Sequence, residues 1–189
     1  MNKLILCEGA TDAILLSYYL ERTAGWKFVR QPPQDVSIRA TEQNEEVTWY
    51  KKNNDYLLIC AVGGKDNFGK FFDDKIQKPL VMSDAFEKIA IVADRDNREV
   101  SEIETEASAF LKVPCGTIKN NQWNDCSYTN EFRMEKTFSA LLVVIPQEQQ
   151  GALETALLKI HMIRALSRKQ ERSLLKCVKK HYDIFQRIV

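Results

Sequence analysis

Four short apolar runs dominate the hydropathy pattern of the chain. They lie at residues 3–7, 55–62, 89–93 and 139–145. Continuous runs of this length indicate strands that are buried on both faces of a parallel sheet. Stretches with the apolar spacing of amphipathic helices lie between them. The pattern therefore predicts the α/β class, with a mostly parallel central sheet of about four strands flanked by helices.

Two further features complete the predicted architecture. Asn53-Asn54 separates residues 47–52 from residues 55–62, and a two-residue link of this kind favours a β-hairpin, here as an insertion. Beyond Pro146, apolar side chains recur at helical spacing. We therefore expect one α/β domain over residues 1–150, with a C-terminal helical extension over residues 151–189 packed on it.

Acidic side chains gather at two of the predicted strand ends. Glu8 follows the first apolar run and Asp12 lies in the first turn of the next helix, while Asp94 and Asp96 follow the third run. The carboxyl ends of parallel strands meet at one edge of a sheet, where ligands bind. Four carboxylates in one crevice would repel one another, so such a cluster typically holds a divalent cation.

Each motif also has a plainer interpretation when it is taken alone. Asp12 can cap the helix that it begins, and Asp94-Arg95-Asp96-Asn97 can be a polar turn after a strand. Gly63-Gly64-Lys65 ends the second apolar run, where Lys65 is either an anion-binding group or a surface lysine in a turn.

Composition bounds the possible functions. The chain has 189 residues, of which 44% are hydrophobic and 28% charged, and its formal net charge is +1. A net charge this small gives no overall field that would favour nucleic acid or a membrane. No apolar run reaches about 18 residues, so we expect no membrane span. The five cysteines are scattered without a CxxC pair, which predicts no zinc site and a reduced, cytoplasmic protein.

The acidic motifs together resemble a known family. Glu8-Gly9-x-x-Asp12 with Asp94-x-Asp96 is similar to the Toprim domain of topoisomerases, bacterial primases, recombination-repair proteins and OLD-family nucleases. Asp94-Arg95-Asp96-Asn97 is most similar to the OLD nucleases and to small stand-alone Toprim proteins. The resemblance covers roughly residues 3–150. It implies a Rossmann-like Toprim fold, Mg²⁺ held by Glu8, Asp94 and Asp96, phosphodiester chemistry, and a role in DNA repair or defence. OLD-like members carry a further acid downstream, which makes Glu154 an expected metal ligand.

The chemistry of the residues suggests a role for each. Glu8 can share the metal or act as general base or acid. Asp12 and Glu154 can hold a second ion, with two metals about 3.5–4 Å apart in an in-line displacement. Lys65 or Arg95 can stabilise the developing negative charge, and Mn²⁺ is an alternative to Mg²⁺.

A basic segment near the C-terminus offers a second surface for nucleic acid. Arg168, Arg172 and Lys176 recur at helical spacing, which suits contacts to a phosphate backbone together with Arg95. The plainer interpretation of the C-terminal segment is a solvated helix face.

Three functions follow from these motifs. The first is a metal-dependent nuclease acting on DNA or RNA. The second is a non-catalytic nucleic-acid- or nucleotide-binding module that acts with a partner ATPase. The third is a phosphatase or phospho-acceptor domain, which fits less well because Asn97 and Arg98 follow Asp96 where a haloacid-dehalogenase pattern requires other residues. The sequence leaves the oligomeric state open.

Overall fold

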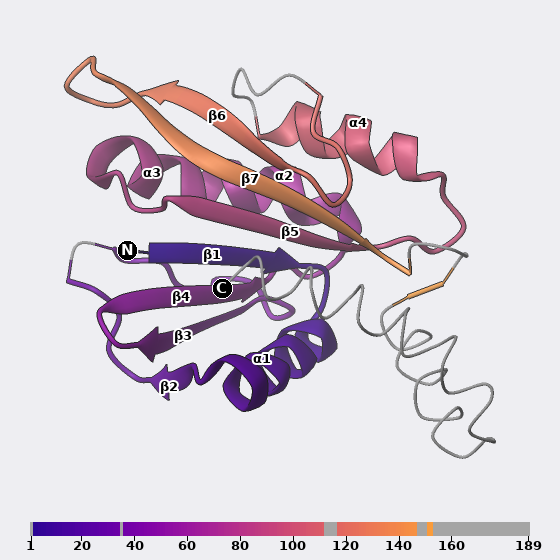
Figure 1. Cartoon of the computed structure of the whole chain (residues 1–189), viewed down its shortest axis with the longest axis horizontal. Helices are drawn as coiled ribbons and strands as arrows, with labels where there is room; N and C mark the ends of the chain where they lie inside the picture. The colour runs from indigo at the N-terminus through magenta and orange to yellow at the C-terminus, as the bar shows by residue number, and fades with distance from the viewer. Residues whose placement is uncertain (1, 35, 112–116, 147–150, 153–189) are drawn as a thin grey trace.

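One sheet with helices on both faces organises the chain (Figure 1). The computed structural model describes residues 2–34, 36–111, 117–146 and 151–152. Residues 153–189, which include most of the predicted helical extension, lie outside the described residues. The elements are β1 (Asn2–Cys7), α1 (Ala10–Ala24), β2 (Lys27–Val29), β3 (Glu46–Lys52), β4 (Asp55–Ala61), the 3-10 turn η1 (Lys65–Asn67), α2 (Phe68–Phe71), the π-helical turn η2 (Phe72–Ile76), α3 (Gln77–Ser83), β5 (Lys88–Asp94), α4 (Val100–Phe110), β6 (Trp123–Thr129) and β7 (Glu135–Ile145).

The sheet has seven strands in the order β2-β3-β4-β1-β5-β7-β6. β4, β1, β5 and β7 pair in parallel with their neighbours in that order. The outer pairings, β2 with β3, β3 with β4, and β6 with β7, are antiparallel. The predicted mostly parallel, Rossmann-like sheet of about four strands is therefore wrong, because the sheet is mixed and three of its six pairings are antiparallel.

The error has a physical cause at the edges of the sheet. Antiparallel edge strands need only one buried face, so they carry polar residues that interrupt an apolar run. β6 has the sequence WNDCSYT, in which only Cys126 and Tyr128 are buried. The predicted hairpin across Asn53-Asn54 is confirmed, since β3 pairs antiparallel with β4, and both of its strands belong to the main sheet. A search for continuous apolar runs finds the buried strands and misses the outer ones.

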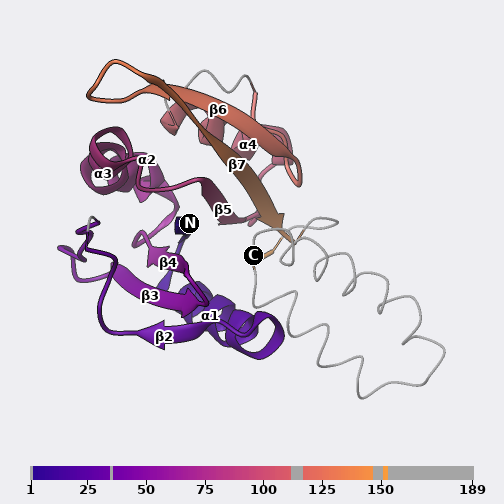
Figure 2. The same cartoon turned by 60° about the vertical axis from the view of Figure 1, so that its left-hand side comes forward.

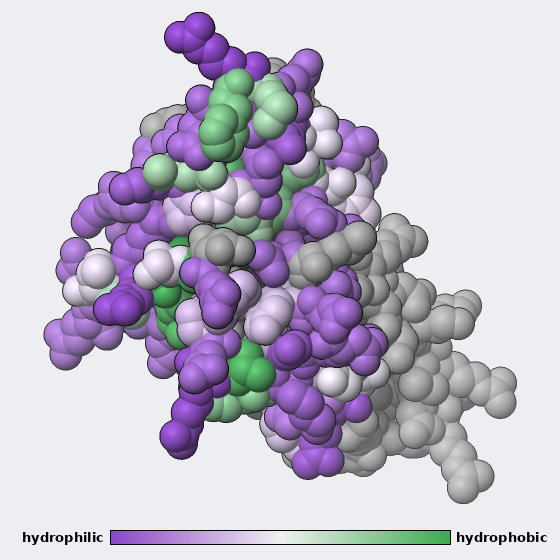
Figure 3. All heavy atoms as spheres, turned by 90° about the vertical axis from the view of Figure 1, so that its left-hand side faces the viewer, coloured by the Kyte–Doolittle hydropathy of each residue, from purple (hydrophilic) through white to green (hydrophobic). Residues whose placement is uncertain are grey.

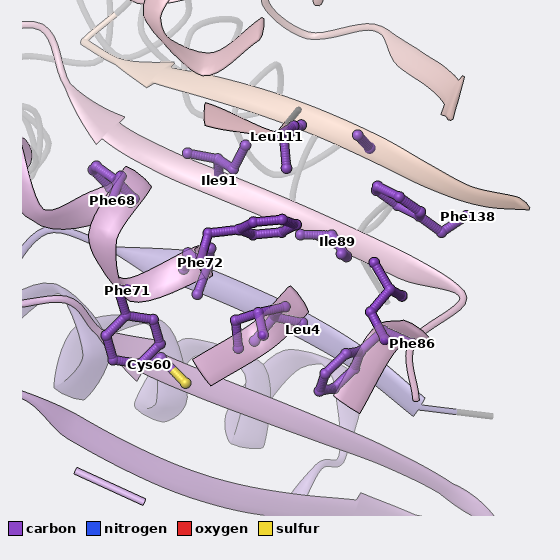
Figure 4. Close-up of a cluster of buried hydrophobic side chains, with 14 of the residues drawn as sticks. Leu4, Cys60, Phe68, Phe71, Phe72, Phe86, Ile89, Ile91, Leu111 and Phe138 are labelled. Carbon is purple, nitrogen blue, oxygen red and sulfur yellow. The ribbon is translucent and has the colours of Figure 1, made fainter. Parts of the chain in front are cut away.

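Alternate residues of the central strands feed two separate hydrophobic cores. Leu4 and Leu6 of β1 face the core beneath α2, α3 and α4, whereas Ile5 and Cys7 face the core beneath α1. Figures 1 and 2 show α1 on one face of the sheet and the other three helices on the opposite face. Figure 4 shows the larger core, where the aromatic rings of α2 and η2 lie against β1 and β5. Burial of both faces anchors the strand ends firmly in the sheet.

Figure 3 shows mostly hydrophilic side chains on the face it presents, with small apolar groups over the turn between β6 and β7. Phe132 and Met134 of that turn are 69% and 49% exposed. Among the described residues, no helix is long and apolar enough to cross a membrane.

The cysteines differ from one another in state. Cys7 and Cys60 are buried free thiols, and burial raises the pKa of the Cys7 thiol. Cys126 is disulfide-bonded, so the prediction that the cysteines are reduced is wrong at that position.

Candidate functional site

A hydrogen bond from backbone to side chain links the ends of the first and third apolar runs at the candidate site. β1 and β5 are parallel neighbours, with Cys7 opposite Val92. Glu8 follows the end of β1, and its Oε1 accepts a hydrogen bond of 2.9 Å from the backbone N–H of Asp94. The Glu8 side chain is only 14% exposed. The two motifs, which lie far apart in the sequence, therefore meet at the carboxyl edge of the central strands.

Asp12 supports the Glu8 turn from within α1. Its Oδ2 accepts a hydrogen bond of 2.9 Å from the backbone N–H of Gly9, which is the N-cap of that helix. Asp12 is only 6% exposed. The cap satisfies a donor that the helix leaves unpaired and fixes the turn that carries Glu8. The structure therefore gives Asp12 a positioning role, while its charge also acts on Glu8.

The Asp-x-Asp motif reverses the chain immediately after β5. The backbone N–H of Arg95 donates to the carbonyl of Ile145 at 2.8 Å. Asp96 has a φ of 50°, in the left-handed region, which aspartate tolerates better than most residues. Its backbone exchanges hydrogen bonds of 2.7 and 2.8 Å with Gly151. Asp94 and Asp96 are thus presented by a turn, which differs from a continuing strand, where they would point to opposite faces.

Lys65 reaches the same edge from β4. The backbone N–H of Gly64 donates to the carbonyl of Glu8 at 2.9 Å, which holds the end of β4 beside the Glu8 turn. The ammonium group of Lys65 lies 3.3 Å from a carboxylate oxygen of Asp96. A lysine from a third strand end therefore meets the acidic motif.

Two arginines lie behind the acids. The Arg95 side chain is directed toward α4, with Nε donating to the carbonyl of Arg98 at 3.2 Å and an amino group 3.5 Å from Glu99. Arg98 lies 4.0 Å from Glu8 and 2.7 Å from Glu106. Sequence reasoning missed Arg98 as a member of the site, although its place two residues after Asp96 was a usable signal.

The surroundings of Glu8 disfavour its ionised form. Burial raises its pKa above the ordinary range, and the neighbouring charges of Asp96 and Asp12 raise it further. The Asp94 N–H and Arg98 lower the pKa of Glu8 and only partly offset these effects. A carboxyl group with a raised pKa is suited to proton transfer near neutral pH.

The donor set fits Mg²⁺ in kind. Mg²⁺ prefers hard oxygen ligands, keeps several waters, and needs only one or two carboxylates when a phosphate supplies the rest. Within residues 2–34, 36–111, 117–146 and 151–152, no three histidine, cysteine, aspartate or glutamate side chains lie close enough to hold one ion. In this arrangement Lys65 and Arg98 provide the positive charge beside Asp96 and Glu8.

Glu154, Arg168, Arg172 and Lys176 lie outside the described residues.

Comparisons with known proteins bear on the fold only. No protein-family model and no curated protein sequence matches the chain. It is similar in structure to a hypothetical protein from Pyrococcus horikoshii OT3, with a TM-score of 0.61 and 18% identity over 95% of this chain and 74% of that chain. A lactoylglutathione lyase from Agrobacterium tumefaciens matches at 15% identity over 74% of this chain and 91% of that chain. Its TM-score of 0.23 is too low to carry an argument. The archaeal structure shows a similar fold, with no function attached to it.

Proposed function

We propose that the chain is a Mg²⁺-dependent nuclease that resembles Toprim nucleases in its acidic motifs. The hydrogen bond from the Asp94 N–H to Glu8 carries the proposal, because it brings the two motifs to one sheet edge. One or two of the carboxylates of Glu8, Asp94 and Asp96 would hold the ion, with waters and a substrate phosphate as its other ligands, and the ion would supply Lewis acidity and an activated water. The proposed substrate is DNA or RNA.

Side chains of the protein would carry out proton transfer and charge stabilisation. Glu8, whose pKa is raised, would take a proton from an attacking water or return one to the leaving oxygen. Lys65, which pairs with Asp96, would stabilise negative charge on the phosphate oxygens. Asp12 holds the turn beneath Glu8 through its bond to Gly9.

A second candidate is a non-catalytic nucleic-acid-binding module that acts with a partner ATPase. The observation that favours it is the charge balance of the site, where Lys65 and Arg98 lie beside the acids that a metal would need. A site neutralised by its own cations has less affinity for a divalent ion. This candidate predicts salt-sensitive binding of nucleic acid without turnover.

The test is cleavage of single- and double-stranded DNA and RNA in Mg²⁺ and then in Mn²⁺. We expect the wild-type protein to cleave at least one substrate, and Asp94→Asn and Asp96→Asn each to abolish cleavage without lowering the melting temperature. Glu131→Gln is the matched control, because Glu131 is exposed in the turn at the opposite end of β7. Binding without cleavage in either metal would favour the second candidate. Cleavage that survives Asp94→Asn would refute the proposed site.

A further inference from the structure

A cavity of about 310 Å³ lies at the end of β4, where Gly63 lines it and the next residue, Gly64, donates its backbone N–H to the carbonyl of Glu8. Gly63 lies two residues before Lys65, which pairs with Asp96. The loop of residues 41–45 forms another wall, and the helical turns that follow η1 form the rest. The volume is at the lower end of known ligand sites, about 300–1,000 Å³. The cavity is therefore large enough for one small group.

A buried ion pair holds the loop of the cavity in one conformation. Lys75 pairs with Glu45, and the two side chains are 12% and 7% exposed. The same carboxylate oxygen of Glu45 accepts the backbone N–H groups of Thr41 at 2.8 Å and Glu42 at 3.0 Å. Lys75 also donates to the hydroxyl of Thr41 at 2.7 Å. Buried ion pairs seldom stabilise a fold more than apolar residues would. Here the pair fixes the cavity wall in advance of binding.

Two backbone features let this wall form. Gly63 has a φ of 81°, and a Cβ added there would come within 3.3 Å of the side chain and the carbonyl oxygen of Asn44. The loop can thus approach the end of β4 only because the residue there is glycine. η2 is a π-helical turn, and such turns are rare and frequently occur at functional sites. Lys75 lies within it.

The chemistry of the lining favours a neutral, polar ligand. Glu42, Glu45 and Asp74 line the cavity against Lys70 and Lys75, which makes its surface unfavourable for a phosphate. Lys75 pairs with Glu45, and Lys70 lies 3.8 Å from Glu42. The two ammonium groups are therefore already occupied by carboxylates.

Side-chain amides of the lining can pair with a base. Gln43 and Asn44 line the cavity, as does Asn67, whose amide nitrogen donates to the carbonyl of Gly63 at 2.9 Å. Amides can pair with the donor and acceptor edge of a nucleobase. Phe71 also lines it but is only 2% exposed, so recognition would use the edge of a base rather than stacking.

We propose that this cavity receives the base of an unpaired nucleotide next to the phosphodiester held at Glu8 and Asp96. The inference rests on the proposed function and adds the class of substrate. A base in the cavity has left its helical stack, because the edges of a stacked and paired base are not accessible in this way. The substrate is therefore single-stranded, or frayed, at the position beside the cut.

The test is fluorescence anisotropy with short labelled strands in Ca²⁺, which separates binding from turnover. We expect single strands to bind at least about tenfold more tightly than a blunt duplex of the same sequence. The double variant Gln43→Ala/Asn44→Ala should lose about tenfold in affinity for single strands, within the range of a base-reading contact. The matched control is the double variant Gln31→Ala/Gln34→Ala, in which Gln43 and Asn44 are unchanged. Both substituted glutamines are exposed, and neither lines the cavity.

A scan with single abasic positions locates the base along the strand. We expect one abasic position to weaken binding to the wild-type protein and to have no effect on Gln43→Ala/Asn44→Ala. Equal affinity for single strands and duplex, or no effect of any abasic position, would overturn the inference. Mononucleotides that compete as well as whole strands would also overturn it, because the cavity would then serve a free nucleotide.

The base-binding experiment and the cleavage assay can fail independently of each other. Cleavage in Mg²⁺ that depends on Asp94, without any effect of the cavity variant, leaves the nuclease and removes the base site. Base-dependent binding without any cleavage leaves the base site and removes the nuclease.

Discussion

The ammonium group of Lys65 lies 3.3 Å from the carboxylate of Asp96 and joins the turn after β4 to the turn after β5. The two side chains are 41% and 38% exposed. Solvent screens such a pair, so its net contribution to stability is small, about 0–1 kcal/mol. The pair bears on the proposed metal site, because it places a cation of the chain beside an acid that the ion would use.

Lys65→Met should raise the affinity for Mn²⁺ several-fold, because the metal no longer competes with an ammonium group for Asp96. Turnover should fall at the same time, because the phosphate loses a positive neighbour. Isothermal titration with Mn²⁺ and a cleavage assay measure the two effects. Lys27→Met is the matched control, since Lys27 makes a comparable exposed pair with Glu21 and does not line the cavity. An unchanged Mn²⁺ affinity would contradict the competition.

Glu8→Gln should preserve the fold and lower turnover by about 10²–10⁴-fold. The glutamine carbonyl can still accept the hydrogen bond from the Asp94 N–H, while the acid–base group is lost. Glu8→Ala, by contrast, leaves that N–H unsatisfied and should lower the free energy of unfolding by about 1–3 kcal/mol. Chemical denaturation and single-turnover cleavage distinguish the two variants. Full activity of Glu8→Gln would exclude Glu8 as the proton-transfer group.

Glu45→Gln should destabilise the fold in a pH-dependent way. Burial alone would raise the pKa of Glu45, but its bonds to Lys75 and to the Thr41 and Glu42 N–H groups hold the pKa below its usual value. A carboxyl group with a lowered pKa in the folded state contributes stability that is present above its unfolded pKa and is lost as pH falls through the folded pKa. We expect a loss of about 1.5–3 kcal/mol at neutral pH.

The pH dependence of this loss of unfolding free energy tests whether the charge of Glu45 causes it. The difference in unfolding free energy between wild type and Glu45→Gln should shrink as pH falls below the ordinary glutamate pKa, and urea titrations at several pH values measure it. A difference that stays constant into acid would show that Glu45 stabilises through packing rather than charge.

Gly63→Ala should destabilise the protein more than Gly25→Ala. Both glycines have a positive φ, of 81° and 75°, and an alanine in that region costs about 1–2 kcal/mol. Only Gly63 also has a neighbour, Asn44, within 3.3 Å of an added Cβ. Thermal denaturation of both variants isolates the cost of the contact. Equal losses would mean that the loop of residues 41–45 moves aside without resistance.

The acidic residues of the candidate site could be predicted from the sequence, because continuous apolar runs show where buried strands end. Glu8 and Asp94 each follow an apolar run, and parallel neighbouring strands bring such ends together. The partners of these acids were not accessible in the same way. Arg98 reaches Glu8 through the turn after β5, and that turn depends on the backbone of Asp96.

By itself, the sequence determined the buried central strands and the acidic residues at their ends, because continuous apolar runs and the residues after them are local properties of the chain. Only the tertiary structure decided the extent of the sheet, since β6 gains its place by pairing with β7 rather than by its own hydropathy. It also decided the cavity beside Gly63, whose loop is held by the distant Lys75. Pairing partners and buried ion pairs depend on contacts between remote segments, and those contacts exist only once the chain has folded.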